Sequence, residues 1–395
     1  MILTDRVSRI EGSVALAITT RASELRRAGV DIINLSVGEP DFPTPDHIIA
    51  AAKQAMDDGY TRYTPGAGLP ELREAVTVKL LRDNHIRLVP EQVIVSNGSK
   101  HSLFNACLTL FDRGDEVIIF VPYWQPFSDV VKLAHATPVF AGTDPERQFE
   151  PVFQDLEACI TPRTKGIIMN SPSNPTGGVW SQEATEYMIE LAREHDLWLL
   201  SDECYEALAY DAPSVSPASL APEYEKILTF QSCSKTYAMT GWRIGYMAGP
   251  VEVVEAMTKI QGQSASCPNS VSQMAAITAL TGDQSVVKEF REAFKKRRDL
   301  MIEQLSQIPG LSCRNPGGAF FVFLNVSGLF GKATQGYHLS SAKDVTEYLL
   351  HGVHVATVNG EGFGDQEHIR LSYAVSEDNI KAATDRIAHA VALLN

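Results

Sequence analysis

Several patterns that define common protein classes are missing from this 395-residue sequence. No apolar run approaches the roughly 18 residues of a membrane-spanning helix. The opening residues, MILTDRVSRIEGS, contain no apolar run of signal-peptide length. The six cysteines form no C-x-x-C pair and show no zinc-site spacing. We therefore expect a soluble, cytoplasmic chain whose thiols are reduced.

Motifs of several enzyme classes are missing as well. The sequence has no G-x-x-x-x-G-K-[ST] loop, no G-x-G-x-x-G, no G-x-S-x-G, and no H-E-x-x-H among its ten histidines. We expect no metal site. Positive charge is scarce, because 34 Lys and Arg face 48 Asp and Glu, for a net charge of −14. Such a chain is a poor binder of nucleic acid or of an anionic membrane, and we expect neither as a partner.

Short apolar runs alternate with helix-like segments between residues 92 and 250. The runs are QVIVS, EVIIF, TPVFA, KGIIMN, LWLLSDE, KILTF and RIGYMAG. Helices are expected near 46–58, 70–83, 99–110, 124–133 and 182–195. This alternation predicts an α/β fold with a large domain, whose mostly parallel sheet is flanked by helices.

A second, smaller unit follows a long charged helix near residues 283–307. It contains the runs AFFVFLNV, VHVAT and EHIRLSY, a helix near 341–351 and a final helix near 376–394. We therefore predict a large domain over 46–290 and a small α+β domain over 291–395.

Polar side chains directly follow several of the expected strands. They are Ser99 and Lys100, Asn174, Asp202 and Tyr205, and Ser232, Ser234 and Lys235. Ligands of an open parallel sheet bind at the carboxyl ends of its strands. The sequence therefore predicts one site at this edge.

Three of these positions suggest particular chemistry, and each has a simpler alternative. Lys235 can form a Schiff base or act as a base, although a single lysine is more often at the surface. Asp202 can face a cation such as a protonated pyridine nitrogen, or it can cap a helix. NGSK can cradle a phosphate at a helix start, or Ser99 and its neighbours can be an ordinary cap.

Five further residues are candidates from their own surroundings. Arg243 can join Ser232 and Ser234 around a phosphate. Arg370 can clamp a carboxylate or form a structural ion pair. Trp124 can stack on a flat ring or belong to the core. Tyr63 can donate to an anion or simply lie in a loop, and Gly38 can serve a turn or a close approach to a ligand.

Taken together, the motifs resemble one family. SCSKTYAMTGWRIGY is similar to the cofactor-lysine segment of class I aminotransferases, which are pyridoxal-phosphate enzymes of fold type I. SPSNPTG, SDECYE, LSVGEPDFPTP, YTPGAGLPELREA and HIRLSY are also similar, in the family's order, over nearly the whole chain. Ser99 followed by Lys100 resembles the bacterial aspartate aminotransferase branch. The departures, Asn359-Gly360 for Pro-Gly and SPS for SPN, replace no site residue.

The resemblance implies roles in binding pyridoxal 5'-phosphate. Lys235 would form the Schiff base and move the substrate proton, Asp202 would pair with the pyridine nitrogen, and Tyr205 would bind the phenolic oxygen together with Asn174. The phosphate would be held by Ser99, Lys100, Ser232, Ser234 and Arg243, and by Tyr63 of the other subunit of a homodimer with shared active sites. Trp124 would stack on the ring. The amino acid would contact Gly38, Trp124, Asn174, Lys100 and Arg370, with Arg370 on its α-carboxylate.

The resemblance further implies that residues 1–45 form an N-terminal arm and part of the small domain. The expected activity is transamination between an amino acid, with aspartate first, and 2-oxoglutarate. An alternative within the fold is an aminotransferase for aromatic, prephenate or neutral substrates, or a β-lyase. A more distant alternative is a non-catalytic regulator that binds the cofactor as a ligand.

Overall fold

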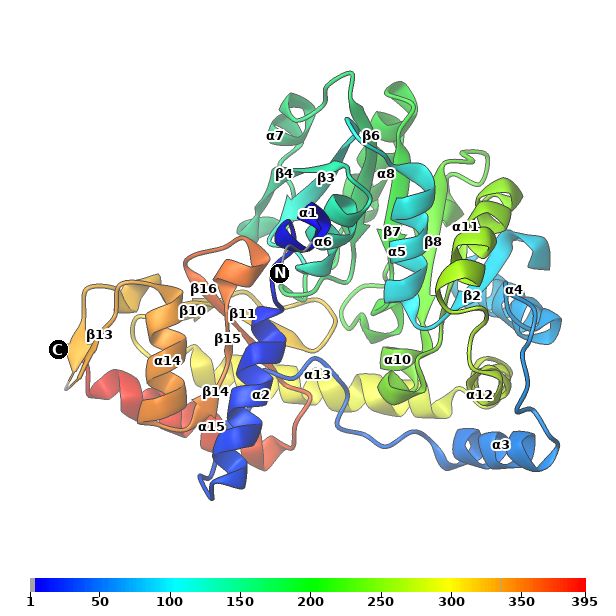
Figure 1. Ribbon diagram of the computed structural model, residues 1–395. Helices are drawn as coiled ribbons and strands as arrows, with labels where there is room; N and C mark the ends of the chain where they lie inside the picture. The colour runs from blue at the N-terminus through cyan, green and yellow to red at the C-terminus, as the bar shows by residue number, and fades with distance from the viewer. Residues whose placement is uncertain (1–3, 335) are drawn as a thin grey trace.

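An eight-stranded sheet lies at the centre of the larger part of the protein (Figure 1). The computed structural model describes residues 4–334 and 336–395. The strand order is β2-β9-β8-β7-β6-β3-β4-β5. In chain order the strands are β2 (Val93–Ser96), β3 (Glu116–Val121), β4 (Thr137–Asp144), β5 (Glu150–Pro151), β6 (Thr164–Asn170), β7 (Trp198–Asp202), β8 (Ile227–Ser232) and β9 (Gly245–Ala248).

Most neighbours in this sheet run parallel. The pairs β4–β3, β3–β6, β6–β7 and β7–β8 are parallel, whereas β9 is antiparallel to both β2 and β8, and β5 is antiparallel to β4. The predicted mostly parallel sheet is confirmed. The reversed direction of β9 was not predicted, since an apolar run such as RIGYMAG carries no information about strand direction.

Helices cover both faces of the sheet. One face packs against α5, α6 and α11 in a single buried apolar cluster. The other face packs against α3, α4 and α12 near β2 and β9, and against α7, α8 and α9 near β6 and β7. Burial on both faces explains why the strands read as continuous apolar runs. The helices are α3 (Asp46–Asp57), α4 (Pro70–Asn84), α5 (Ser99–Leu110), α6 (Pro126–Leu133), α7 (Phe153–Ala158), α8 (Gln182–Glu194), α9 (Pro217–Leu220), α10 (Cys233–Thr236), α11 (Val251–Ser264) and α12 (Ser270–Thr281).

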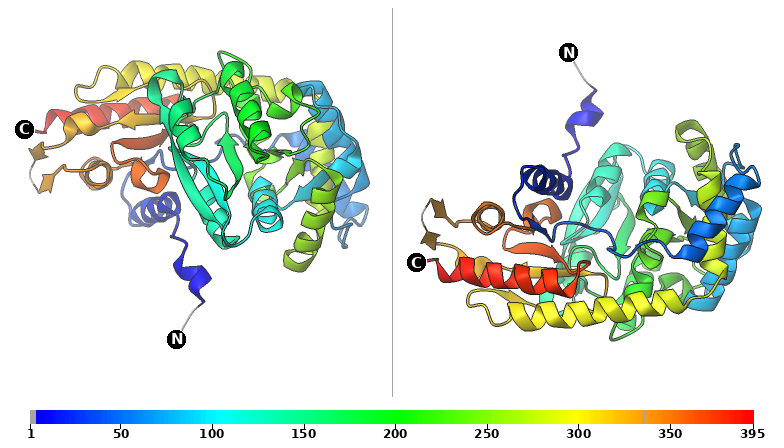
Figure 2. Two further views of the ribbon diagram at one scale, coloured as in Figure 1. Left: turned by 90° about the horizontal axis from the view of Figure 1, so that it is seen from above. Right: turned by 90° about the horizontal axis from the view of Figure 1, so that it is seen from below.

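The smaller part is built on a four-stranded antiparallel sheet of order β10-β11-β16-β15. The long helix α13 extends from the larger part to the smaller one and lies beside α15 (Figure 2). Near the N-terminus, β1 pairs in parallel with β14, and α2 contacts β14 and β15. The elements are α2 (Val14–Arg27), β1 (Ile33–Asn34), α13 (Ser285–Leu305), β10 (Ser312–Cys313), β11 (Phe321–Asn325), β12 (Ala333–Thr334), β13 (Tyr337–His338), α14 (Ala342–Gly352), β14 (Val355–Ala356), β15 (Val358–Asn359), β16 (His368–Ser372) and α15 (Glu377–Ala392).

The N-terminal segment extends away from this body. Its short helix α1 (Asp5–Ser8) projects from the rest of the chain in both views of Figure 2. Within residues 4–334 and 336–395, no helix is both long and apolar enough to cross a membrane.

Element boundaries largely follow the predicted ranges, with one difference that affects the site. The helix expected from Trp124 begins at Pro126. Proline favours the first helical position, because its missing N–H has no partner there and its φ is already helical. Trp124 therefore lies in the loop that leads into α6. The strand expected at VHVAT is also short, covering Val355–Ala356 only.

Candidate active site

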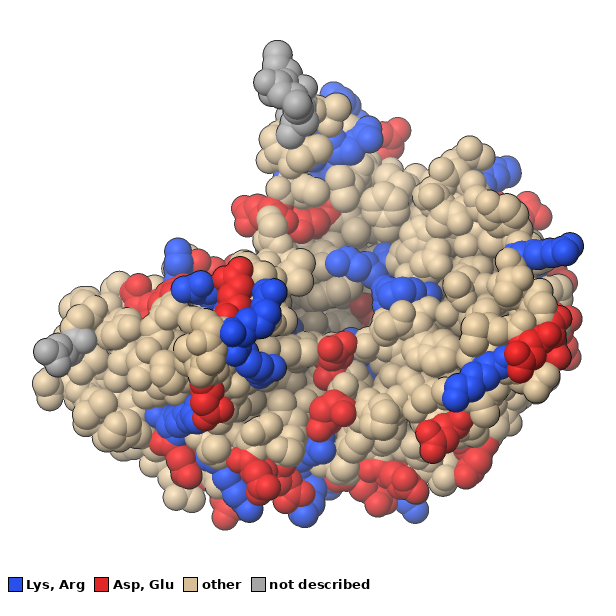
Figure 3. Space-filling view, turned by 60° about the horizontal axis from the view of Figure 1, so that its bottom comes forward, with Lys and Arg blue, Asp and Glu red and all other residues tan. Residues whose placement is uncertain are grey.

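A cavity of about 380 Å³ lies at the carboxyl ends of β6, β7 and β8. Every predicted site residue except Tyr63 lines it. Figure 3 shows a hollow between the two parts of the molecule, bordered by side chains of both charges. Its volume falls in the range of small-molecule sites, about 300–1,000 Å³.

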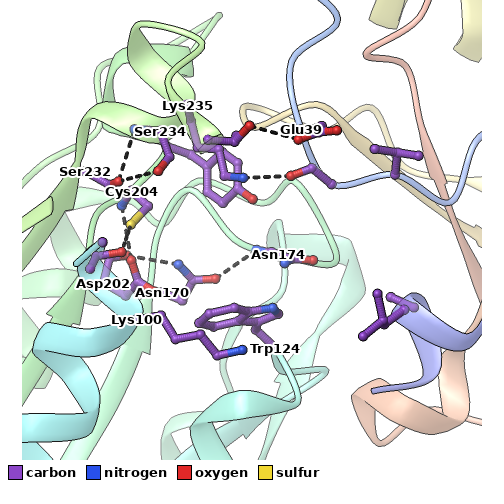
Figure 4. A pocket seen from close by; sticks show the side chains of 18 of the residues that line it. Glu39, Lys100, Trp124, Asn170, Asn174, Asp202, Cys204, Ser232, Ser234 and Lys235 are labelled. Carbon is purple, nitrogen blue, oxygen red and sulfur yellow. Dashed lines mark hydrogen bonds between the residues drawn. The ribbon is translucent and has the colours of Figure 1, made fainter. Parts of the chain in front are cut away.

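Lys235 lies in the short helix α10, directly after the buried strand β8. The hydroxyl of Ser232 caps this helix by accepting from the backbone N–H of Ser234 at 3.0 Å. The amine Nζ of Lys235 donates to the carbonyl of Gly38 at 2.7 Å (Figure 4). Burial lowers the pKa of Lys235 to about 8. More of this amine is therefore uncharged near neutral pH than in an ordinary lysine, and the uncharged form can act as a nucleophile or base.

Asp202 is the last residue of β7, and its side chain is buried. One carboxylate oxygen accepts from the backbone N–H of Cys204 at 3.2 Å. Within the described residues it forms no ion pair. Burial raises its pKa, although the hydrogen bonds with Cys204 and the charge of Lys235 act in the opposite direction. The site thus holds a carboxylate that a cation in the cavity would stabilise.

Tyr205 and Asn174 line the same cavity from neighbouring loops. The ring of Tyr205 packs edge-on against Phe320 and Phe321, and burial raises the pKa of its hydroxyl. The backbone N–H of Asn174 donates to the side-chain oxygen of Asn170 at 2.8 Å, which fixes the loop after β6.

Arg370, on β16, is buried and reaches the cavity from the smaller part. Nη1 donates to the side-chain oxygen of Asn174 at 2.8 Å, and Nη2 donates to the carbonyl of Ser36 at 2.9 Å. Its Nε is buried without a partner, and no carboxylate pairs with the guanidinium in the described part of the chain. The centre of the guanidinium lies 4.4 Å from the ring centroid of Phe321. Burial lowers the pKa of Arg370 to about 10, as expected for a cation without its anion.

Positive charge and hydroxyl groups gather at the start of α5. Gly98, with φ +85°, leaves the space that Arg243 occupies, because an added Cβ would lie 2.6 Å from Nη2. A Cβ on Gly245 would lie 2.3 Å from the backbone nitrogen of Ser99, so this approach also depends on glycine. The N–H groups of Ser99 and Lys100 precede the first hydrogen bonds of the helix, which His101 and Ser102 donate to the carbonyl of Gly98. Ser232 and Ser234 supply hydroxyls. The result is an anion pocket of phosphate character.

Trp124 and Lys100 form another wall of the cavity. The amine of Lys100 lies 5.2 Å from the ring centroid of Trp124, and Figure 4 shows it pointing along that ring. Burial and the neighbouring charge of Arg243 lower the pKa of Lys100. Its side chain lines the cavity, although the residue is also exposed to solvent.

Two of the predicted residues, Tyr63 and Gly38, place no side chain in the cavity of this chain. Tyr63 lies outside the cavity and is 89% exposed, so it does not contact the site within one chain. Gly38 contributes the carbonyl that Lys235 binds. A Cβ on Gly38 would meet only Phe321, at an ordinary 3.8 Å, so the fold itself does not require glycine there.

Several lining residues were not selected from the sequence. Glu39 accepts from the hydroxyl of Thr240 at 2.8 Å, and the thiol of Cys204 lies 2.9 Å from the hydroxyl of Ser99. Glu39, Cys204 and Asn170 lie inside or beside the motifs that predicted the site, so their positions in the sequence could have indicated that they line the cavity. Leu16 on α2 gave no such signal, because nothing local links that helix to the sheet.

Comparison with known proteins identifies the class of protein. The model of the family described as aminotransferase class I and II matches residues 30–387. The chain belongs to this family and is an aminotransferase. It is 44% identical over 389 residues to the aspartate/prephenate aminotransferase of Cereibacter sphaeroides, covering 98% of this chain and 97% of that protein. It is 43% identical to the aspartate aminotransferase of Rhizobium meliloti, covering 98% and 95%.

Solved structures show the same fold. The aspartate aminotransferase from Rhizobium meliloti superposes with a TM-score of 0.96 at 43% identity, covering 100% of both chains. The aspartate aminotransferase from Thermus thermophilus with maleate gives a TM-score of 0.94 at 42% identity, covering 99% of this chain and 100% of the other. The predicted fold type I architecture is therefore confirmed.

Proposed function

We propose that the cavity binds pyridoxal 5'-phosphate and that the enzyme transfers an amino group between aspartate and 2-oxoglutarate. One observation carries the proposal: the Lys235 amine, the unpaired Asp202 carboxylate and the anion pocket at the start of α5 line the same cavity. These three features match the aldehyde, the pyridine nitrogen and the phosphate of this cofactor.

The donor set fits each part of the cofactor. The phosphate would lie among the first-turn N–H groups of α5, the hydroxyls of Ser232 and Ser234, and the guanidinium of Arg243. Asp202 would then gain the cation that it lacks. Trp124 would cover one face of the ring, and Tyr205 and Asn174 would bind its phenolic oxygen.

When bound, pyridoxal 5'-phosphate supplies an aldehyde that condenses with amines and a ring that accepts electrons from the substrate α-carbon. Asp202 would hold the proton on the ring nitrogen, because a carboxylate nearby favours the charged pyridinium. Lys235 would serve as the base that takes the proton from the substrate α-carbon and then as the acid that gives a proton back. A proton transfer positioned in this way typically contributes about 10²–10⁴-fold to the rate.

Two cations in the cavity support a dicarboxylate substrate. Arg370, which lines the cavity, would bind the α-carboxylate through two parallel hydrogen bonds. Lys100 would bind the distal carboxylate from beside Trp124. The names of the relatives, aspartate aminotransferase and aspartate/prephenate aminotransferase, support the same substrate class. Prephenate also carries two carboxylates, and we propose it as a second amino acceptor.

We also propose that the enzyme is a homodimer with shared active sites. Tyr63 is 89% exposed in the single chain, and α1 extends away from the body (Figure 2). Tyr63 would complete the phosphate pocket of the partner subunit. We further propose residues 46–290 as the large domain and 291–395 as the small one, with 1–45 as an arm that adds to the small domain.

The decisive experiment compares the wild type with Lys235→Ala. The wild type, purified with the cofactor, should show its visible absorbance and a spectral change when glutamate is added. Lys235→Ala should lose turnover and the amine-dependent absorbance band. Lys226→Ala, which removes a lysine that pairs with Asp196, serves as the control and should behave like the wild type. Wild-type turnover in Lys235→Ala would contradict the proposal.

A panel of half-reactions would test substrate choice. Aspartate, glutamate, alanine and phenylalanine are followed as donors, and 2-oxoglutarate and prephenate as acceptors. Faster reaction with alanine or phenylalanine than with aspartate would favour a neutral or aromatic substrate instead.

A further inference from the structure

A buried lysine outside the cavity lies behind the ends of β7 and β8. Lys79, on α4, is 2% exposed. Its ammonium donates to the side-chain oxygens of Asn84 at 2.8 Å, Glu206 at 2.6 Å and Gln231 at 2.6 Å. An ammonium has three N–H donors, so all of them are used.

The hydrogen bonds continue from Gln231 toward β7. Its side-chain oxygen also accepts from the hydroxyl of Tyr246 at 3.0 Å, and its amide nitrogen donates to Glu203 at 3.2 Å. The other carboxylate oxygen of Glu203 accepts from Ser201 at 2.9 Å and from Ser216 at 2.7 Å. The network therefore joins α4, β7, β8 and β9.

Three residues of this network, Glu203, Glu206 and Gln231, are each next in the chain to a residue of the cavity. Glu203 follows Asp202, Glu206 follows Tyr205, and Gln231 precedes Ser232. Successive side chains of a strand point to opposite faces, so Gln231 lies on the face away from Ser232. The backbone N–H of Glu203 donates to the carbonyl of Phe230 at 2.9 Å, which ties the two strand ends together. Hydrogen bonds that hold the network residues in place therefore also fix the backbone of the adjacent cavity residues.

We propose that Lys79 is a positioning residue for the active site, which sets the places of Asp202, Tyr205 and Ser232 by binding Glu206 and Gln231 behind them. This inference rests on the proposed function. A purely apolar core here would fill the space equally well, because buried ion pairs are often no more stabilising than apolar packing. Hydrogen bonds differ from apolar contacts in fixing direction as well as proximity.

The test uses two variants of the full-length enzyme. Lys79→Met removes the ammonium but leaves Glu206 unpaired, so it can fail to fold. Lys79→Met/Glu206→Gln removes both charges and keeps the shape of the acidic side chain. The control is Arg298→Met, which removes an equally buried cation outside the cavity; Arg298 pairs with Asp211 and Asp299.

Three quantities are measured: the melting temperature, the dissociation constant for pyridoxal 5'-phosphate added to cofactor-free protein, and the pH midpoint of the bound cofactor's absorbance. We expect the double variant to bind the cofactor about tenfold more weakly, as if the displaced cavity residues had lost about one charge-assisted hydrogen bond to the cofactor. We also expect its absorbance midpoint to move by about half a pH unit, because Asp202 no longer holds its place. Arg298→Met should melt at a lower temperature. It should keep the dissociation constant for the cofactor within about twofold of the wild type and leave the pH midpoint of the absorbance unchanged.

Two results would overturn the inference. One is a double variant that melts lower but binds cofactor and titrates as the wild type does, which would leave Lys79 a purely structural role. The other is an equal change in Arg298→Met, which would make the effect a general consequence of lost stability. A wild type without any cofactor absorbance would instead contradict the proposed function itself.

Discussion

The Nη1 of Arg370 donates to the side-chain oxygen of Asn174 at 2.8 Å, so β16 of the smaller part is linked across the cavity to the loop after β6. This bond, together with that from Nη2 to Ser36, fixes the plane of the guanidinium while Nε stays unpaired. A substrate carboxylate would therefore meet a cation whose orientation is already set, which lowers the entropic cost of binding it.

We predict that Arg370→Lys weakens catalysis with every amino acid substrate. Lysine keeps the charge but cannot form two parallel hydrogen bonds to one carboxylate. Losing one charge-assisted hydrogen bond, worth about 1.5–3 kcal/mol, should lower kcat/KM about 10- to 100-fold. Steady-state kinetics with aspartate and alanine measure this, and similar losses for both are expected because both carry the α-carboxylate. A loss confined to aspartate would instead place Arg370 on the distal carboxylate.

Lys235 gives a prediction for the pH dependence of stability. Its pKa is about 8 in the folded protein, below the ordinary 10.5. Between these values the unfolded chain binds more protons at this residue, so the free energy of unfolding of the cofactor-free protein rises with pH. Below the lower value both states are charged, and the cost of burying the charge is fully present.

The measurement compares melting temperatures of the cofactor-free wild type and Lys235→Met across this range. The variant should be the more stable protein near neutral pH, and its advantage should shrink as the pH rises from about 8 to about 10. A constant difference across the range would contradict the lowered pKa.

Much of the fold was predictable because its signals are local. The helix Ser99–Leu110 was predicted to the residue, since a glycine and a small polar residue mark its start directly after an apolar strand. The clustering of Asp202, Lys235 and Asn174 followed from one rule about the ends of parallel strands. These residues needed no knowledge of strand order, only of where each strand stops.

Other features depend on contacts between distant parts of the chain and left no local trace. The hold of Lys79 on Glu206 and Gln231 joins residues separated by 127 and 152 positions, and nothing in their own segments indicates it. The direction of β9 and the contribution of α2 to the cavity are of the same kind. The apolar neighbours of Arg370 suggested only that its side chain points away from them, and its partner Asn174 became evident only from the packing of the two parts.

Lys100 gives a prediction about substrate choice. Its amine faces the cavity beside Trp124 and lies near no carboxylate that pairs with it in the described residues. Lys100→Ala keeps the backbone N–H groups of α5 and removes only the amine. We expect kcat/KM for aspartate to fall about 10- to 100-fold, and that for alanine or phenylalanine to change by less than about threefold.

Lys132→Ala serves as a matched control for this variant, since Lys132 is a half-buried lysine on α6 that pairs with Asp129 and does not line the cavity. It should leave the ratio of aspartate to alanine activity unchanged. Equal losses for all substrates in Lys100→Ala would assign the amine to the cofactor phosphate rather than to the substrate.

Tyr63 gives a prediction about the dimer. In the single chain its side chain is 89% exposed and outside the cavity, so Tyr63→Phe should not change the melting behaviour of an isolated subunit. If its hydroxyl donates to the phosphate held by the partner, its loss removes one hydrogen bond to a charged group, worth about 1.5–3 kcal/mol. The dissociation constant for pyridoxal 5'-phosphate should then rise at least about tenfold, while sedimentation still shows a dimer.

Tyr60→Phe, which removes another exposed hydroxyl from the same loop, should bind the cofactor as the wild type does. A monomeric wild type with full activity, or unchanged cofactor affinity in Tyr63→Phe, would contradict the shared site, because the hydroxyl would then have no phosphate within reach.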